Sequence, residues 1–442
     1  MLVRTFAALQ ILSLTLLDAT AHARQPNVIL IMADDLGYET IGANGGESYQ
    51  TPHLDKLAAG GMRFDRCYVQ PVCTPTRVEL MTGQSNVRNY IEFGVLDPDA
   101  TTFAQLFKQA GFATGISGKW QLGRKAGLPQ HFGFDESCLW QQTRRPSRYP
   151  NPGLEYNNEE RDFTNGEYGP DLVNDFALDF ITRHKDKPFL LYYPMLLTHD
   201  PYVPTPDSVE WDPKAKNESD HKAPKHFGEM VTYMDKLVGK LTAKVDELGI
   251  RDETIIIFLG DNGTGIHATS QFKGKPYKGG KGTTTARGMH VPLIVNWSGH
   301  VPAGKVNDDL VSSVDFLPTL CDAAGITPPQ SLTLDGQSFW PQALGETGLP
   351  RAWLYSWFSS DGGEGNKSEF VMDKRFKLYR DGRMYDLAAD PLEAGSPLDA
   401  AKLTADQQTT AREFKQVLTS FADARPATLI KPGKPKKNGV KR

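Results

Sequence analysis

The sequence predicts an α/β fold in which helices flank a large, mixed and mostly parallel sheet, followed by a smaller antiparallel α+β domain. Apolar runs of strand length alternate with helical segments over residues 27–324, which is the pattern of buried parallel strands. From about residue 338 the pattern changes to two strands joined by an Asp-Gly turn, over residues 375–387, and a final helix. We therefore assign residues 24–345 to the main domain and residues 346–425 to the smaller one.

The elements follow from the spacing of apolar residues and from the residues that cap each segment. Continuous apolar runs predict strands at residues 27–33, 112–116, 188–196, 254–259 and 290–297. Helical spacing and capping signals predict helices at residues 52–59, 102–111, 170–184, 225–248, 311–324 and 405–422. Residues 124–170 are rich in Arg, Pro, Asn and Tyr and show little periodicity, so we expect long loops there.

The N-terminus reads as a secretory signal over residues 1–23. Arg4 supplies the positive start, residues 6–17 form the apolar run, and Ala21-His22-Ala23 is a small-x-small cleavage site. A membrane anchor is the alternative, but the apolar run is short for a membrane span, and no later segment is apolar enough to be one. We therefore expect an exported protein, secreted or periplasmic, with no integral membrane segment once the signal is removed.

Charge and composition describe an ordinary globular protein with an acidic body. The chain has 442 residues, 39% of them hydrophobic, and a formal net charge of −4. Residues 431–442 carry six basic residues and no acidic one, so the remainder is more acidic than the total suggests. This balance argues against a nucleic-acid-binding protein. We predict that residues 426–442 form a basic, disordered tail, the alternative being a contact for polyanions or a membrane surface.

Four cysteines are few for an exported chain of this length. If Cys73 is catalytic, Cys67, Cys138 and Cys321 remain, so at most one disulfide is expected. The fold must then be held by its core.

The segment Cys73-Thr74-Pro75-Thr76-Arg77 is the start of a predicted helix. Thr74 suits the N-cap, Pro75 suits the first helical position, and Gly83 would end the helix. Cys73 would then lie at the positive end of the helix dipole, where a thiol becomes more reactive and an anion is favoured. Taken alone, the segment is better explained as a buried cysteine before a surface helix.

Polar residues follow four of the predicted strands. Singly, each has an ordinary explanation as a helix cap, surface lysine, loop histidine or turn. Because ligands bind beyond the carboxyl ends of strands in open parallel sheets, however, we expect these residues to share one face with Cys73. Adjacent carboxylates indicate a hard cation, and a cation with lysines suits an oxyanion ester. The clusters are Asp34-Asp35, Lys119, His199 and Asp261-Asn262.

These motifs together resemble the type I sulfatases, the formylglycine-dependent family of the alkaline phosphatase superfamily. The resemblance runs from Asn27 to about Glu393. It rests on Asp34-Asp35, Thr-Pro-His-Leu-Asp, Cys-x-Pro-x-Arg, Gly-Lys-Trp-x-Leu-Gly, Thr-His-x-Pro, Gly-Asp-Asn-Gly, Gly-Gly-Lys-Gly-Thr-Thr and a late Tyr-Asp-Leu with Asp-Pro. It implies an alkaline-phosphatase-like fold and a cysteine that a sulfatase-maturating enzyme oxidises to formylglycine (3-oxoalanine), whose hydrate attacks sulfur.

The resemblance also implies a role for each matched residue. One calcium ion would be held by Asp34, Asp35, Asp261, Asn262 and the modified Cys73. Arg77 would orient the hydrate, and Lys119 and Lys281 would bind sulfate oxygens. His199 would protonate the leaving alcohol. The implied function is an exported, calcium-dependent sulfatase.

Two positions depart from the family pattern. Gln121 stands where relatives usually carry histidine, and glutamine cannot act as a base near neutral pH. Another group then serves as base, or turnover is slow, or the site is altered for a particular substrate. Arg287 stands where relatives tend to have Glu-Gly-Gly, and we expect it to contact substrate, as we do Gln121.

The substrate is predicted to be a sulfated carbohydrate. Export and the residues Trp140, Arg144, Arg145 and Arg148 in the predicted loops favour an anionic sugar. The alternatives are a phosphate or phosphonate ester hydrolase of the same superfamily, and a non-catalytic binder of sulfated glycans suggested by Gln121.

Overall fold

The structure is a computed structural model that describes residues 25–215, 223–363, 365 and 367–430. The predicted signal at residues 1–23 lies outside the described residues. So does most of the predicted tail; within its described part Ala427–Leu429 form one 3-10 turn. In the part of the chain that the structure describes, no helix combines the length and the apolar character needed to cross a bilayer.

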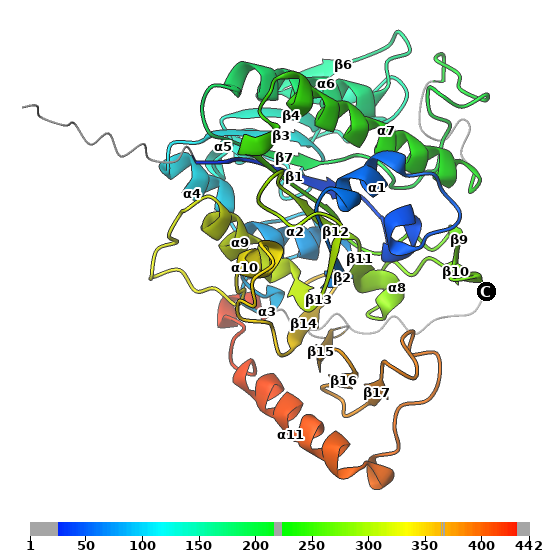
Figure 1. The fold of residues 1–442 in the computed structure, drawn as a ribbon, viewed down its shortest axis with the longest axis vertical. Helices are drawn as coiled ribbons and strands as arrows, with labels where there is room; N and C mark the ends of the chain where they lie inside the picture. Colours follow the sequence, from blue (N-terminus) through cyan, green and yellow to red (C-terminus); the bar gives the residue numbers. More distant parts are fainter. Residues whose placement is uncertain (1–24, 216–222, 364, 366, 431–442) are drawn as a thin grey trace, which may run out of the picture.

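A large sheet of eleven strands forms the centre of the molecule (Figure 1). Five neighbouring strands run parallel in the order β8 (Thr254–Gly260), β1 (Asn27–Ala33), β7 (Phe189–Pro194), β3 (Ala113–Gly118) and β4 (Glu136–Trp140). Antiparallel strands extend both ends. Beside β8 lie β12 (Leu293–Asn296), β2 (Met62–Tyr68) and β11 (His290–Val291), with β13 (Lys305–Ser312) parallel to β2. This confirms the predicted α/β class.

The prediction of long loops over residues 124–170 is wrong. This segment contains a short helix and three strands that form the other end of the sheet: α5 (Leu128–His131), β4, β5 (Gly153–Tyr156) and β6 (Glu159–Asp162). The edge strand β6 has the sequence Glu-Glu-Arg-Asp and is exposed throughout, so it has no apolar periodicity to reveal it. The predicted helix at 311–324 also begins too early, because residues 311 and 312 still belong to β13.

Helices cover both faces of the sheet, because β1 alternates its side chains between two cores. Ile29 and Ile31 point to the core under α1 (Pro52–Ala59), α6 (Gly169–His184) and α7 (His226–Glu247). Val28 and Leu30 point to the opposite core under α2 (Cys73–Thr82), α4 (Phe103–Gln109) and α9 (Phe316–Ala323). In Figure 1, α6 and α7 lie on one side of the central strands and α2 and α9 on the other.

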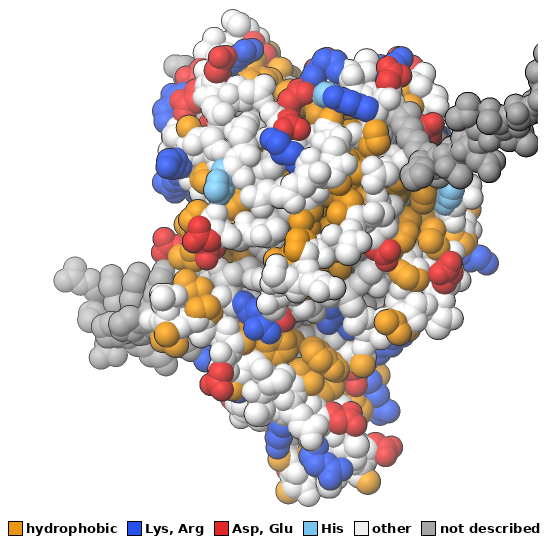
Figure 2. All heavy atoms as spheres, turned by 90° about the vertical axis from the view of Figure 1, so that its left-hand side faces the viewer, with side chains coloured by type: hydrophobic (Ala, Val, Ile, Leu, Met, Phe, Trp, Pro, Cys, Tyr) orange, Lys and Arg blue, Asp and Glu red, His pale blue; other side chains and the backbone are white. Residues whose placement is uncertain are grey.

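The C-terminal unit is a four-stranded antiparallel sheet, β14 to β17, backed by one helix. Its strands are Leu354–Phe358, Ser368–Met372, Phe376–Tyr379 and Met384–Asp386, and the helix is α11 (Ala405–Ser420). Phe421, just after α11, stacks on Tyr355 of β14 with ring centroids 3.8 Å apart. Figure 2 shows this narrower unit below the broad main body, with acidic and basic side chains interspersed on the visible face. A hairpin of β9 (Thr269–Phe272) and β10 (Lys275–Lys278) and helix α8 (Ala286–Met289) lie beside it.

The cysteines contribute no covalent link. All four lie within the described residues, are buried, and carry free thiols. The fold therefore rests on its two large cores and on the ion pairs described below.

Candidate active site

The carboxyl ends of the central strands are tied together by backbone hydrogen bonds. Asp34 N–H donates to Leu197 O after β7 (2.8 Å), and Asp261 N–H after β8 donates to Ala33 O at the end of β1 (2.9 Å). Lys119 N–H after β3 donates to Pro194 O at the end of β7 (2.7 Å). Segments far apart in the sequence therefore meet at one edge of the sheet, as expected for parallel strands.

Cys73 is the first residue of α2, and its side chain is buried beside this edge. The N-cap position is held by Val72, so the predicted cap role of Thr74 is wrong. The Oγ1 of Thr74 instead accepts the N–H of Gly94 at 3.1 Å, which joins the start of α2 to a neighbouring loop. Burial raises the pKa of the Cys73 thiol despite the nearby Lys119, so the unmodified thiol is a poor nucleophile.

Three ion pairs cross the site. Lys119 Nζ lies 2.6 Å from Asp34 Oδ2, Arg77 Nη2 lies 2.9 Å from Asp261 Oδ2, and Lys281 Nζ lies 2.7 Å from Asp35 Oδ1. The first two pairs are fully buried. Arg77 Nη1 also donates to the carbonyl of Lys119 (2.9 Å), so α2 is linked to the end of β3. Removing one partner of such a pair leaves an uncompensated buried charge, which is strongly destabilising.

The carboxyl groups of this cluster titrate far from their ordinary range. Burial by itself raises the pKa of Asp34, but Lys119, His199 and Arg77 together bring it far below the usual value. Burial and the negative charge of Asp34 raise the pKa of Asp261 to about 7. Such divergent values in neighbouring acids are typical of functional sites. A bound cation would hold all of these carboxyls ionised.

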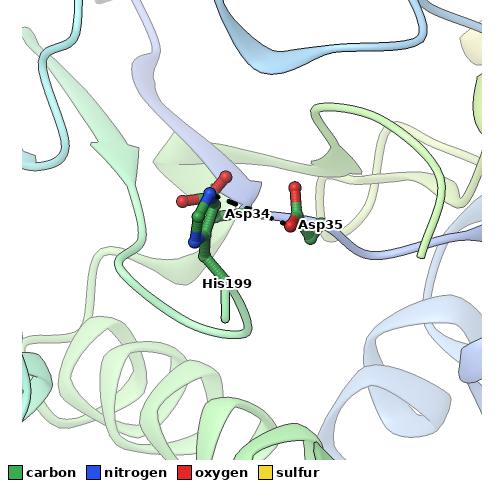
Figure 3. A group of neighbouring side chains, drawn as sticks. All are labelled: Asp34, Asp35 and His199. Carbon is green, nitrogen blue, oxygen red and sulfur yellow. Dashed lines mark ion pairs between the residues drawn. The ribbon is translucent and has the colours of Figure 1, made fainter. Parts of the chain in front are cut away.

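His199 lies in the loop after β7, beside the two carboxylates that end β1 (Figure 3). Its Nε2 is 3.9 Å from Asp35 Oδ2, and its Nδ1 lies 2.5 Å from the carbonyl of Asp200. Because a carbonyl oxygen only accepts, Nδ1 carries the hydrogen and Nε2 is left to gain or lose the exchangeable proton. Burial lowers the pKa of His199 to about 4.

Two buried oxygen atoms in the cluster have no hydrogen-bond donor among the described residues. They are Asp34 Oδ1 and Asn262 Oδ1. Buried polar atoms are nearly always paired, so such orphans indicate a missing partner. One atom each of Asp34, Cys73 and Asp261 lie within 4.8 Å of one another, as do atoms of Asp34, Asp35 and His199. Carboxylate and amide oxygens are the ligands that calcium prefers, so the residues fit this ion.

Gln121 contacts the nucleophile position directly. Its Oε1 accepts a hydrogen bond from Cys73 Sγ over 3.1 Å, and its backbone is left-handed with φ of 54°. The backbone of Arg287 packs against Gly263, the residue after Asn262, while its guanidinium carbon is 5.5 Å from the centre of the Tyr277 ring. The structure therefore brings the predicted site residues together, but the contact of the Arg287 side chain with substrate stays a prediction.

Comparison with known proteins identifies the family. Residues 26–326 match the family model described as Sulfatase. The chain belongs to the sulfatase family. As a member it is a sulfuric ester hydrolase with the fold of the alkaline phosphatase superfamily. Residues 281–420 also match a second family model, described as N-sulphoglucosamine sulphohydrolase, C-terminal.

Named relatives cover most of this sulfatase. It is 33% identical to arylsulfatase A of Bos taurus, over 96% of this chain and 89% of that protein. It is 31% identical to N-acetylgalactosamine-6-sulfatase of Canis lupus familiaris, over 76% of this chain and 69% of that protein. Among solved structures, Ps i-CgsB in complex with k-i-k-neocarrahexaose superposes with a TM-score of 0.77 at 26% identity, covering 91% of this chain and 94% of that one.

Two residues that support the sulfatase site were not predicted from the sequence. Thr198 N–H donates to the carbonyl of Asp34 at 2.7 Å and so fixes the β1 end against the loop after β7. Tyr149 O–H contacts the carbonyls of Leu196 (3.0 Å) and His199 (2.5 Å), which holds the histidine loop in place. Thr198 belongs to the Thr-His-x-Pro motif, so the sequence could have identified it as a site residue. Tyr149 lies within residues 124–170, for which we predict loops, and no motif near it indicates a role in the site.

Proposed function

We propose that this sulfatase is an exported, calcium-dependent enzyme that hydrolyses a sulfate ester of a carbohydrate through a formylglycine made from Cys73. The observation that carries the proposal is the buried cluster at the carboxyl ends of β1, β3, β7 and β8. There three carboxylates face three cations around Cys73, with two oxygen atoms left unsatisfied.

Asp34, Asp35, Asp261 and Asn262 would hold the calcium ion together with the modified Cys73. The ion supplies positive charge that offsets the negative charge of the reacting ester. The fit is electrostatic as well as chemical, because the carboxylates and the cations Arg77, Lys119 and Lys281 already balance one another. A divalent cation then makes the site net positive, which suits an anionic substrate.

Formylglycine at position 73 supplies a hydrated aldehyde oxygen as nucleophile in place of the thiol. The chain orients this position from two sides. Arg77 lies one helical turn along α2 and is locked by Asp261 and the Lys119 carbonyl. Gln121 places an amide oxygen beside the reacting position. Such preorganised donors and acceptors act without reorganisation during the reaction.

Lys119 and Lys281 would donate to sulfate oxygens, and His199 would protonate the leaving alcohol. The Lys281 and His199 side chains are each about a fifth exposed, so they face the entrance, whereas Lys119 is buried below them. With its pKa at about 4, His199 is neutral at pH 7 before substrate enters. Binding of an anionic ester raises the pKa of a neighbouring histidine, so the acid becomes charged when substrate is present.

The carbohydrate part of the proposal is supported by the relatives and by the chain itself. One relative is named for N-acetylgalactosamine-6-sulfate, and one similar structure is described with D-Glucosamine-2-N, 6-O-disulfate as its substrate. The residues Trp140, Arg145 and Arg148 provide an aromatic ring and cations close to the site. Export rests on the predicted signal and would be tested by sequencing the N-terminus of the mature protein.

The proposal is tested with protein co-expressed with a sulfatase-maturating enzyme and checked by intact mass for conversion of Cys73. We expect release of inorganic sulfate from an aryl sulfate and from defined sulfated saccharides, with little activity on the matching aryl phosphate. Cys73→Ala should abolish it. Full hydrolysis by Cys73→Ala, or a preference for the phosphate ester, would overturn the proposal.

A further inference from the structure

Arg145 lies beside the active site although it comes from the far end of the sheet. It follows β4, and its own backbone is left-handed with φ of 52°. Its Nη2 is 3.6 Å from where a Cβ at Gly94 would lie. Gly94 in turn donates its N–H to the side chain of Thr74, the residue after Cys73. A short chain of contacts therefore places this guanidinium next to the nucleophile helix.

Arg145 has no carboxylate partner among the described residues. Its neighbour Arg144 shows the contrast, since that side chain is exposed and bonds Glu160 (3.2 Å) and Asp162 (2.8 Å). The positive charges that act on Arg145 are the guanidinium groups of Arg124 and Arg148. Partial burial and the two arginines lower the pKa of Arg145.

Arrangements of this kind are costly without an anion. Like charges repel, and a guanidinium that is partly removed from water loses hydration, which an anionic acceptor replaces best. Arg148 is fixed by stacking on Trp140, with its guanidinium carbon 4.2 Å from the ring centre. It cannot move away to relieve the repulsion without losing this contact. Because no carboxylate among the described residues pairs with Arg145 itself, we look to the ligand for the negative charge that this guanidinium would bind.

We propose that Arg145 forms a second anion-binding subsite that takes a sulfate or carboxylate of the substrate other than the ester being cleaved. The inference rests on the proposed function and narrows its substrate class to saccharides with at least two anionic groups. The planar fork of arginine suits either group, because both present paired oxygens for bidentate hydrogen bonds.

The experiment compares Arg145→Gln with Arg183→Gln, a matched loss of charge at an exposed arginine of α6 that is already paired with Glu136 and Asp179. Four substrates are used: 4-nitrophenyl sulfate, a neutral disaccharide with one sulfate, the same disaccharide with a second sulfate, and its counterpart with a uronic acid. We expect the wild type to favour one or both dianionic substrates. Arg145→Gln should raise KM for these roughly 10- to 30-fold and leave 4-nitrophenyl sulfate and the monosulfated disaccharide unchanged.

Arg183→Gln should leave all four substrates unchanged, and Arg145→Lys should restore only part of the loss. The dianionic disaccharide whose KM rises, the disulfated one or the one with a uronic acid, identifies the anion that Arg145 binds. Equal losses on mono- and dianionic substrates, or a wild type with no preference for the second anion, would overturn the inference.

Saccharide binding, measured on a variant that cannot hydrolyse its substrate, tests this inference separately from the proposed function. In Cys73→Ala protein, calorimetric titration with the two dianionic disaccharides should show the same 10- to 30-fold weakening on adding Arg145→Gln. If the wild type released no sulfate from any substrate, the proposed function would fail while this binding difference could still stand. If Cys73→Ala and Cys73→Ala/Arg145→Gln bind the dianionic disaccharides with equal affinity, the subsite is refuted.

Discussion

Cys73 Sγ donates a hydrogen bond to Gln121 Oε1 over 3.1 Å. This contact puts an amide where the family pattern has an imidazole, directly beside the reacting position. An amide oxygen accepts hydrogen bonds but does not take up a proton near neutral pH. The site therefore orients the nucleophile well, yet offers no base at this point. His199, whose Nε2 lies 3.9 Å from Asp35 Oδ2, has in our proposal the separate role of protonating the leaving alcohol.

Gln121→His is expected to raise kcat about tenfold or more, since a positioned general base contributes factors of this size. Histidine tolerates the left-handed backbone found at position 121 better than most residues. The gain should appear only at pH values where the new imidazole is neutral, so the kcat profile of the variant should rise through its pKa. Gln121→Leu serves as control and should fall below wild type. A variant with unchanged or lower kcat would mean that the site has adapted to the amide.

Calcium is expected to stabilise the protein and to be required for activity. At a free concentration 100 times its Kd the ion should add about 2.7 kcal/mol to the free energy of unfolding. Thermal melts with chelator and with added calcium measure this. In Asp261→Asn the calcium-dependent rise in Tm should shrink, while Asp308→Asn, an exposed aspartate paired with Arg66, should keep it. Equal melting with and without chelator would contradict the calcium assignment.

Glu79, buried on the nucleophile helix α2, should make stability depend on pH. Burial raises the pKa of this carboxyl from 4.5 to about 7, although Ser313, Asn86 and Gln70 donate to it. Between these values the folded state binds more protons than the unfolded state. The contribution of this group to the free energy of unfolding therefore falls by roughly 3 kcal/mol as pH rises from 4.5 to 7 and is constant above.

Glu79→Gln removes this titration and keeps an amide oxygen for the donors. Urea denaturation of both proteins across this pH range should show the variant gaining stability relative to wild type as pH rises. Glu247→Gln, at the exposed end of α7, should follow wild type throughout. A wild-type minus variant difference that does not change with pH would show that Glu79 keeps an ordinary pKa in the fold.

The central strands and the site were predictable because both depend on short, strong patterns. Three of the four recognised central strands, β1, β7 and β8, are almost entirely apolar, and β3 is short and fully buried. Polar residues at the carboxyl ends of neighbouring parallel strands have to meet at one edge of the sheet. Other features depended on tertiary contacts. Strand β6 is exposed and polar, so only pairing with β5 defines it. Threonine is common at helix N-caps, but the hydroxyl of Thr74 instead accepts a hydrogen bond from the N–H of Gly94.

The C-terminal sheet holds the loop that carries Lys281. Lys377 on β16 is buried, pairs with Glu393 (2.7 Å), and donates to the carbonyl of Thr284, three residues after Lys281. We expect Lys377→Met to lose about 3–5 kcal/mol of stability, because the Glu393 charge is left buried without its partner. We also expect KM to rise, because Lys281, which we propose binds sulfate oxygens, loses its support.

The double variant Lys377→Met/Glu393→Leu separates these two effects. Replacing both members of a buried pair by apolar residues is often neutral, so we expect most of the stability to return. The hydrogen bond to Thr284 is still absent, so KM should stay raised. Lys374→Met is the matched control: this lysine is exposed, pairs with Asp308 and Asp309, and should change stability by less than about 1 kcal/mol with no effect on KM. Denaturant melts and steady-state kinetics measure both quantities. If the double variant has the KM of the wild type, the C-terminal sheet does not position Lys281.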